Sequence, residues 1–280
     1  IASMTTTAAV PVFDNGAGSY IHISGTQHTE AVSSMPDWLA QMLHSLILTG
    51  QCTDITLELN DSLMTQVLDS GTVSTSSDFV LAGTCTTSFQ TSGANRSNNI
   101  VVGASRLNNL IVLPGQTVSV SDTILPRTRA NGYKEAGVYV NGAHTSGLGG
   151  GVCQISSTVY NAVKNAGLTV VQRNPHSMPV SYLPKGLDAA IAAGSKDLKF
   201  RNDYTTPVVL YTDTSNKHLT VNVLVWNQEL AGRSFKLWAK QTGALSADTY
   251  FTTYQDGKEV STQFVGTSRY NPYREAVNDD

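Results

Sequence analysis

Charged side chains are scarce in this chain of 280 residues, because Asp, Glu, Lys and Arg together make up 14% of it. An average soluble protein has about 25%. The formal net charge is −3, so no strongly basic surface is expected and nucleic-acid binding is not predicted. No apolar run reaches the roughly 18 residues that a membrane-spanning helix needs. Ser, Thr and Asn supply the polar surface instead, which favours an extracytoplasmic protein.

Motifs for metals and cofactors are missing as well. The sequence has no CxxC, HxxxH or HExxH pattern that would hold zinc. A glycine run at residues 149–151 is not followed by the Lys-Ser/Thr pair of a phosphate-binding loop, and no GxGxxG with an acidic partner is present. We therefore predict neither a metal nor a cofactor.

Cysteine is also rare, with three residues in the whole chain. Cys153 directly follows the glycine run and precedes a helical pattern. A helix start favours the thiolate through its unpaired N–H groups and its dipole, so Cys153 is a candidate nucleophile. The alternative is a small buried residue. Cys52 and Cys85 either form a disulfide in an oxidising compartment, which leaves Cys153 free, or are two separate buried thiols.

The segment after Cys153 predicts a helix, a strand and a turn. Apolar residues recur at helical spacing from Ile155 to Ala166, and Gly167 ends the helix. A β-branched run over 168–171 predicts a strand. Pro175 then predicts a turn that contains His176. We expect this return to carry His176 back towards Cys153, where an imidazole would act as the base.

Several long motifs then give the chain a family resemblance. Residues 147–161 read GLGGGVCQISSTVYN, residues 173–184 read RNPHSMPVSYLP, and shorter matches lie at 113–117, 131–136 and 200–202. In this order they resemble the VanW-domain family of Gram-positive cell-envelope proteins, over about residues 84–211. The family was named for its link to glycopeptide-resistance clusters. Some members look like L,D-transpeptidases, which form 3-3 cross-links in peptidoglycan through a cysteine acyl-enzyme.

The resemblance implies Cys153 as nucleophile and His176 as base. Asp188 is our first choice for the group that orients the imidazole, with Ser177 and Asn174 as alternatives. The remaining predicted residues serve the oxyanion or the substrate, and they are Gly151, Gln154, Ser156, Ser177, Arg127 and Tyr182. For the oxyanion we expect backbone N–H groups around Cys153 and Gln154, or the Gln154 side chain. A surface ion pair is the alternative for Arg127.

We predict an α+β fold in three parts, listed here in chain order: an N-terminal accessory segment at 1–80, a remnant of a peptidoglycan-binding region; the VanW catalytic domain at 81–211; and a β extension packed on it at 212–280. Helices are expected over 36–47, 61–68 and 98–109, and a strand over 54–59. Paired strands are expected over 208–211 and 219–226. An antiparallel sheet should follow, with a hairpin turn at Asp256-Gly257.

The predicted partners are peptidoglycan stem peptides, as acyl donor and as acceptor, for a monomeric enzyme. A cysteine carboxypeptidase or endopeptidase of stem peptides is the first alternative, since water would only replace the acceptor amine. A wall-binding or resistance accessory module with a structural Cys153 is the second. We expect the protein in the cell wall, or anchored through a segment outside this sequence, because the start Ile1-Ala2-Ser3-Met4 looks cut.

Overall fold

A computed structural model of the chain describes residues 6–10, 20–25, 54–58, 79–140, 143–192 and 194–272. The chain divides into two compact units, residues 1–79 and 80–280. In the first unit, strand β1 pairs antiparallel with β2, and β2 pairs parallel with β3. The strands are β1 (Thr6–Val10), β2 (Tyr20–Gly25) and β3 (Asp54–Glu58). The strand expected at 54–59 is confirmed as β3, whereas the helices expected at 36–47 and 61–68 lie outside the described residues.

A four-stranded sheet in the order β4-β12-β11-β5 is the centre of the second unit. Its strands are β4 (Phe79–Ser88), β5 (Leu110–Val112), β11 (Val208–Asp213) and β12 (His218–Trp226). Strand β12 alternates as a half-buried strand should, with Leu219, Val221, Val223 and Val225 completely buried. The antiparallel pairing of β11 with β12 confirms the strand pair that the sequence predicts.

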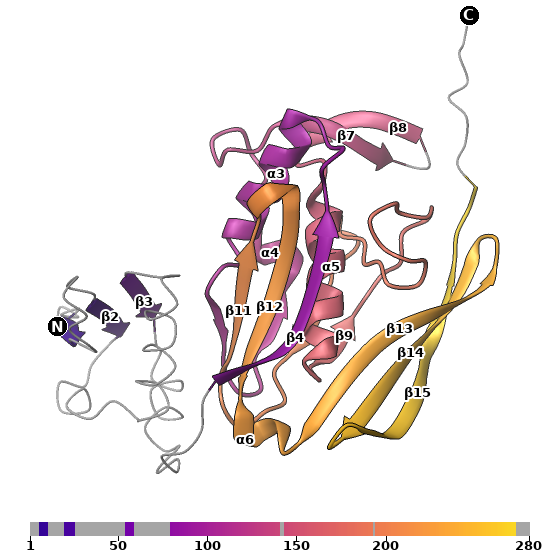
Figure 1. The fold of residues 1–280 in the computed structure, drawn as a ribbon. Helices are drawn as coiled ribbons and strands as arrows, with labels where there is room; N and C mark the ends of the chain where they lie inside the picture. The colour runs from indigo at the N-terminus through magenta and orange to yellow at the C-terminus, as the bar shows by residue number, and fades with distance from the viewer. Residues whose placement is uncertain are drawn as a thin grey trace, which may run out of the picture. The chain divides into compact units, whose positions relative to one another are not determined.

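Helices lie against one face of this sheet (Figure 1). They are α3 (Ala94–Ser105), α4 (Val120–Thr123) and α5 (Val152–Asn165). The predicted apolar face of α5 is confirmed, because Ile155, Val159, Ala162, Val163 and Ala166 are all fully buried. The helix expected at 98–109 is α3, which begins and ends four residues earlier. Its N-cap Gly93 has no side chain to mark the start.

A second sheet, β13-β14-β15, lies on the other side of α5 (Figure 1). Its strands are antiparallel, and a short helix α6 (Asn227–Leu230) precedes them. They are β13 (Arg233–Gly243), β14 (Ser246–Gln255) and β15 (Lys258–Arg269). The predicted hairpin turn is confirmed, with Asp256 and Gly257 both at positive φ. The predicted boundary at 211/212 falls within β11, and β12, the neighbour of β11 in the central sheet, lies beyond it.

Two smaller sheets complete the second unit. One has the order β6-β10-β9, with β6 (Thr117–Ser119), β9 (Thr169–Gln172) and β10 (Lys199–Arg201). The other pairs β7 (Glu135–Val140) with β8 (Ala143–Leu148), and a 3₁₀ turn (Ser215–Lys217) joins β11 to β12. Helices and mainly antiparallel sheets share one core, so the α+β class is confirmed.

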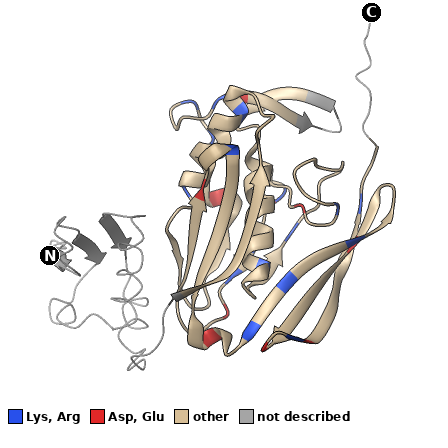
Figure 2. Ribbon diagram, viewed as in Figure 1, with Lys and Arg blue, Asp and Glu red and all other residues tan. Residues whose placement is uncertain are grey.

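Charged residues are sparse over the described ribbon (Figure 2), as the composition requires. Over the described residues, none of the helices combines the length and the apolar character needed to cross a membrane.

Candidate active site

Cys153 stands in the first turn of α5, directly after a tight glycine turn. Gly149 and Gly151 have φ of 81° and 111°, a left-handed region that side chains with a Cβ rarely adopt. Gly150 lies against β7, where an added Cβ would come within 2.6 Å of the Gly137 carbonyl oxygen. Each glycine is therefore needed to place the helix start. The close backbone approach that Gly150 permits is an approach to β7.

The Cys153 thiol is half-buried and donates to the Ile191 carbonyl oxygen at 3.3 Å. Burial is the largest influence on its pKa and raises it. The hydrogen bond and positive charge of His176, the Ile191 contact and the charge of Arg127 together outweigh burial, so the pKa of Cys153 falls below its usual value. The turn at 173–177 thus returns His176 to the start of α5, as the sequence predicts.

His176 is held by Asp188. Its Nδ1 lies 2.7 Å from Asp188 Oδ2, and its backbone N–H donates to the same oxygen at 2.7 Å. With Nδ1 bound in this way, Nε2 is the nitrogen left for the thiol. Burial acts most strongly on His176 and lowers its pKa, but hydrogen bonds and charges from Asp188 and Cys153 raise it to about 9. The arrangement favours a Cys153 thiolate beside a His176 imidazolium at neutral pH.

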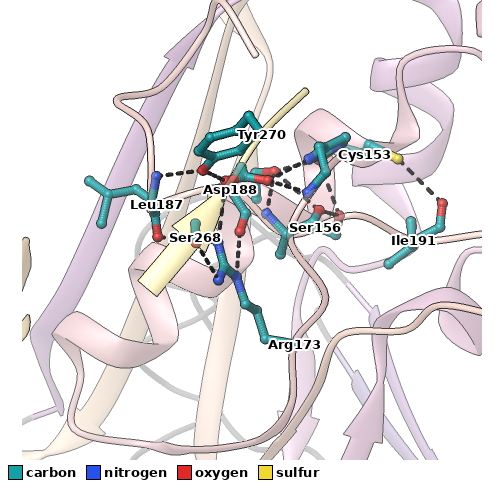
Figure 3. A network of polar contacts seen from close by, with 12 residues as sticks. Cys153, Ser156, Arg173, Leu187, Asp188, Ile191, Ser268 and Tyr270 are labelled. Carbon is teal, nitrogen blue, oxygen red and sulfur yellow. Dashed lines mark hydrogen bonds and ion pairs between the residues drawn. The ribbon is translucent and has the colours of Figure 1, made fainter. Parts of the chain in front are cut away.

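Asp188 is only 1% exposed and has a full set of donors (Figure 3). The Tyr270 hydroxyl donates to its Oδ1 at 2.5 Å, and Arg173 forms an ion pair with the same oxygen at 3.2 Å. Burial, the largest influence, raises the pKa of Asp188. Hydrogen bonds from His176 and Tyr270 and the charge of Arg173 overcome it and lower the pKa to about 2. The carboxylate is therefore ionised beside the imidazole.

One polar side of α5 fixes the loop at 186–191, which supplies both Asp188 and the Ile191 carbonyl. Ser156 donates to the Ala189 carbonyl at 2.5 Å. The Ser157 hydroxyl accepts from the Ala189 N–H at 2.9 Å, and the Asn161 amide donates to the Leu187 carbonyl at 2.7 Å. Because α5 begins at Val152, Ser156 and Ser157 lie beyond its first turn, and both hydroxyls also donate to the Cys153 carbonyl.

Gln154 is a structural residue in this arrangement. Its side chain is almost fully buried, and its amide donates to the Thr87 hydroxyl and the Ser88 carbonyl, both at 3.0 Å. Its Oε1 accepts from Arg96 at 2.9 Å. The Gln154 N–H donates to the Gly151 carbonyl, so the predicted oxyanion role does not fit either group of Gln154. Ser156 is likewise fully buried and bound. The Cys153 N–H has no acceptor within the described part of the chain.

The other predicted site residues, and the alternatives to Asp188, make contacts of different kinds. Arg127 runs along Gly149, with its Cδ 2.9 Å from the point where a Cβ would stand. Tyr182 is half-buried, its hydroxyl 3.4 Å from the Ser157 hydroxyl, and burial above all, with the neighbouring Cys153 charge, raises its pKa. Ser177 has an exposed side chain, and Asn174 donates to the Asp197 carbonyl. Neither is bonded to the His176 ring, whereas Asp188 is.

Sequence reasoning missed the residues that surround Asp188. Arg173 binds the Asp188 carbonyl oxygen at 2.7 Å and the Ser268 hydroxyl at 2.9 Å. Tyr270, beyond β15, also accepts from the Gly186 N–H at 2.6 Å. Arg173 stands in the same motif as His176, three residues before it, which is the one signal that pointed to it. Nothing local marks Tyr270.

The predicted Cys52–Cys85 disulfide gains no support from the structure. Cys85 has a free thiol that packs against the core, and burial raises its pKa to about 12. Cys52 lies outside the described residues. Across the described ranges, no three His, Cys, Asp or Glu side chains are grouped to hold a metal.

A hollow of about 490 Å³ lies elsewhere in the second unit and contains neither Cys153 nor His176. Its lining consists of Asn95, Arg129, Gly132, Tyr133, Lys134 and Glu135.

Comparison with known proteins links the site to one family. Residues 95–224 match the family described as VanW like protein. The chain is 42% identical over 128 residues to the "Uncharacterized protein YoaR" of Bacillus subtilis (strain 168), covering 46% of this chain and 42% of YoaR. It is 35% identical over 114 residues to the "Vancomycin B-type resistance protein VanW" of Enterococcus faecalis (strain ATCC 700802 / V583), covering 39% of this chain and 42% of that protein. The chain therefore spans less than half of either relative, and no solved structure matches it.

Proposed function

Because this chain is a VanW-domain protein through residues 95–224, we propose that it is a cysteine acyltransferase, an L,D-transpeptidase that forms 3-3 cross-links between peptidoglycan stem peptides. The observation that carries the proposal is the chain of contacts from the Cys153 thiol through His176 to the buried Asp188 carboxylate. A cysteine, an imidazole and an orienting carboxylate in this order are the parts of an acyl-transfer site.

The first half-reaction forms an acyl-enzyme. The Cys153 thiolate attacks the carbonyl carbon of the third stem residue, and in this proposal the Cys153 N–H donates to the developing oxyanion. The bond to the nitrogen of the terminal D-amino acid then breaks as His176 gives that nitrogen its proton. A thioester on Cys153 and a free amino acid result, and the imidazole is left neutral.

The second half-reaction transfers the acyl group. His176 takes a proton from the side-chain amine of an acceptor stem, and the amine attacks the thioester carbonyl. Collapse of the tetrahedral intermediate expels the thiolate, which the imidazolium again stabilises. Asp188 keeps Nε2 directed at the sulfur in both halves, because its carboxylate fixes the other ring nitrogen and the His176 N–H together.

Extracytoplasmic action follows from the proposal, since the substrate lies outside the membrane. The printed name of the Enterococcus relative, a vancomycin B-type resistance protein, supports a cell-wall setting. Water in place of the amine would give a carboxypeptidase with the same first half-reaction.

The test is incubation of the wild type, Cys153→Ala and Cys85→Ala with purified tetrapeptide muropeptides, followed by mass spectrometry. Cys85 is a matched control because its thiol is buried, with a pKa of about 12. We expect cross-linked dimers and an acyl adduct in the wild type and Cys85→Ala, and neither in Cys153→Ala. Tripeptides without dimers would assign a carboxypeptidase. Unchanged substrate with all three proteins would refute the catalytic proposal and favour an accessory wall-binding module.

A further inference from the structure

Two arginines flank the glycine turn in front of Cys153, and they differ in how they are bound. Arg96 lies against Gly151, and its guanidinium donates to Gln154 Oε1 at 2.9 Å and to the Ser92 hydroxyl at 2.6 Å. Arg127 lies against Gly149. In the part of the chain that the structure describes, no hydrogen bond or ion pair engages its guanidinium. Arg96 is therefore held in place, and Arg127 is available to a ligand.

The charged residues Asp188 and Arg129 are already paired with groups other than Arg127. Asp188 is occupied by Arg173, His176 and Tyr270. Arg129, two residues along the same loop, forms its ion pair with Glu135 at 2.5 Å. Arg127 is itself half-buried against the turn. Among the described residues no hydrogen bond or ion pair engages this partly desolvated guanidinium, so it gains from any anion that arrives beside it.

The position of Arg127 matches one particular anion. Arg127 packs on Gly149, in the turn that leads directly into Cys153, and its positive charge also lowers the pKa of the Cys153 thiol. This packing puts the Arg127 side chain on the same glycine turn as a carbonyl attached to that sulfur. In a peptide whose last bond is attacked, only the nitrogen and Cα of the expelled residue separate that carbonyl from the terminal carboxylate. With ordinary bond lengths this carboxylate carbon lies within about 4 Å of the carbonyl carbon. A guanidinium is the side chain best suited to bind it.

We propose that Arg127 binds the free α-carboxylate of the amino acid that is expelled, and so restricts the acyl donor to peptides cut one residue from their C-terminus. The inference rests on the proposed acyl transfer and adds its specificity. It explains how the site selects a terminal bond, since an internal bond would place a neutral amide beside Arg127. The tetrapeptide stem ends in such a carboxylate.

The first experiment measures anion binding beside Cys153 without any peptidoglycan. Iodoacetate and iodoacetamide alkylate the same thiolate, forming a C–S bond and releasing iodide, but only the first carries a carboxylate. The ratio of their rates cancels the fraction of thiolate. We expect the ratio of the iodoacetate rate to the iodoacetamide rate at Cys153 to exceed the ratio for free cysteine, and to fall several-fold in Arg127→Gln. Arg127→Lys should retain part of it, and Arg129→Gln should keep the wild-type ratio.

The second experiment measures kcat/KM with two donor tetrapeptides, one ending in a carboxylate and one in a carboxamide. A charge-assisted hydrogen bond of this kind corresponds to a preference of roughly 10- to 100-fold. The wild type and Arg129→Gln should show that preference, and in Arg127→Gln the ratio of the two kcat/KM values should approach one.

An unchanged alkylation ratio or an unchanged donor preference in Arg127→Gln would overturn the assignment of Arg127. If no variant turns over either donor, the proposed function fails, and the alkylation ratio still decides the role of Arg127. If Arg127→Gln does not fold, the wild type itself decides, because a ratio no higher than that of free cysteine contradicts an anion site.

Discussion

The charge of Asp188 is expected to control the ionisation of Cys153 through His176. The substitution Asp188→Asn keeps the size of the side chain but removes the negative charge 2.7 Å from His176 Nδ1. Burial acts on His176 most strongly and lowers its pKa, and the hydrogen bond to Asp188 leads the interactions that raise it. The pKa of His176 is about 9 against an ordinary 6.5, a difference of 9 − 6.5, or about 2.5 units.

We assign about one to two of these units to Asp188, which corresponds to ~1.4–2.7 kcal/mol at 1.36 kcal/mol per unit. The His176 side chain is only 19% exposed, so solvent screens this interaction little. Without the carboxylate the imidazolium loses its proton at a lower pH. Its positive charge, which lowers the pKa of Cys153, is then lost as well. The apparent pKa of the thiol should therefore rise in the variant.

The assay is the rate of alkylation of Cys153 by iodoacetamide, followed by mass spectrometry from about pH 4 to about pH 10. Asp203→Asn is the matched control, because Asp203 pairs with Arg201 on an exposed surface. Near-ultraviolet circular dichroism establishes that Asp188→Asn is folded, since the substitution leaves Arg173 without its counter-charge. A folded variant with the wild-type titration midpoint would refute the reasoning.

Two further predictions concern stability and helix placement. Tyr270→Phe removes a hydrogen bond to the Asp188 carboxylate and should lower the free energy of unfolding by about 1.5–3 kcal/mol, measured by urea denaturation. The pKa of Asp188 is lowered to about 2, so its stabilisation is complete above its unfolded pKa of 3.8 and is lost as the pH falls towards 2. Tyr270→Phe raises the folded-state pKa of Asp188, so this loss should be smaller and should end at a higher pH than in the wild type; an acid loss of the wild-type size that continues down to the wild-type pH would contradict the account. Gly150→Ala places a Cβ 2.6 Å from a backbone oxygen, so it should lower the free energy of unfolding by about 1–3 kcal/mol and slow the alkylation of Cys153. Gly93→Ala is the control, because no atom lies near its Cβ position, and it should have neither effect. Equal effects of the two substitutions would exclude backbone crowding as the cause.

The sequence predicts those parts of the fold whose signals are local. The apolar spacing from Ile155 to Ala166 identifies α5, since one face of a helix must be buried continuously. The Asp256-Gly257 pair identifies a hairpin because both residues tolerate positive φ. The VanW resemblance, which the family match over residues 95–224 confirms, also rests on contiguous motifs that can be read locally. The start of α3 was misplaced because Gly93 offers no capping side chain to read.

The residues that the sequence did not predict are set by contacts distant along the chain. Tyr270 reaches Asp188 across 82 positions, and no periodicity connects them. Gln154 looks like an oxyanion donor because it follows the nucleophile. Only the approach of β4 and Arg96 shows that its amide is already bound. The strand predicted at 208–211 continues to Asp213, so the boundary predicted at 211 falls inside this strand.

These distant contacts also determine how the site is built. Residues 95–224, which match the family, contain Cys153, His176, Asp188 and Arg173. Tyr270 lies after β15, outside that match, yet its hydroxyl joins the Asp188 carboxylate to the Gly186 N–H. A buried carboxylate is stable as a charge only when its oxygens are fully bound. Tyr270, which directly follows the last strand of the second sheet, therefore supports the ionised form of Asp188. The Asp188 carboxylate in turn stabilises the His176 imidazolium, and the imidazolium stabilises the Cys153 thiolate.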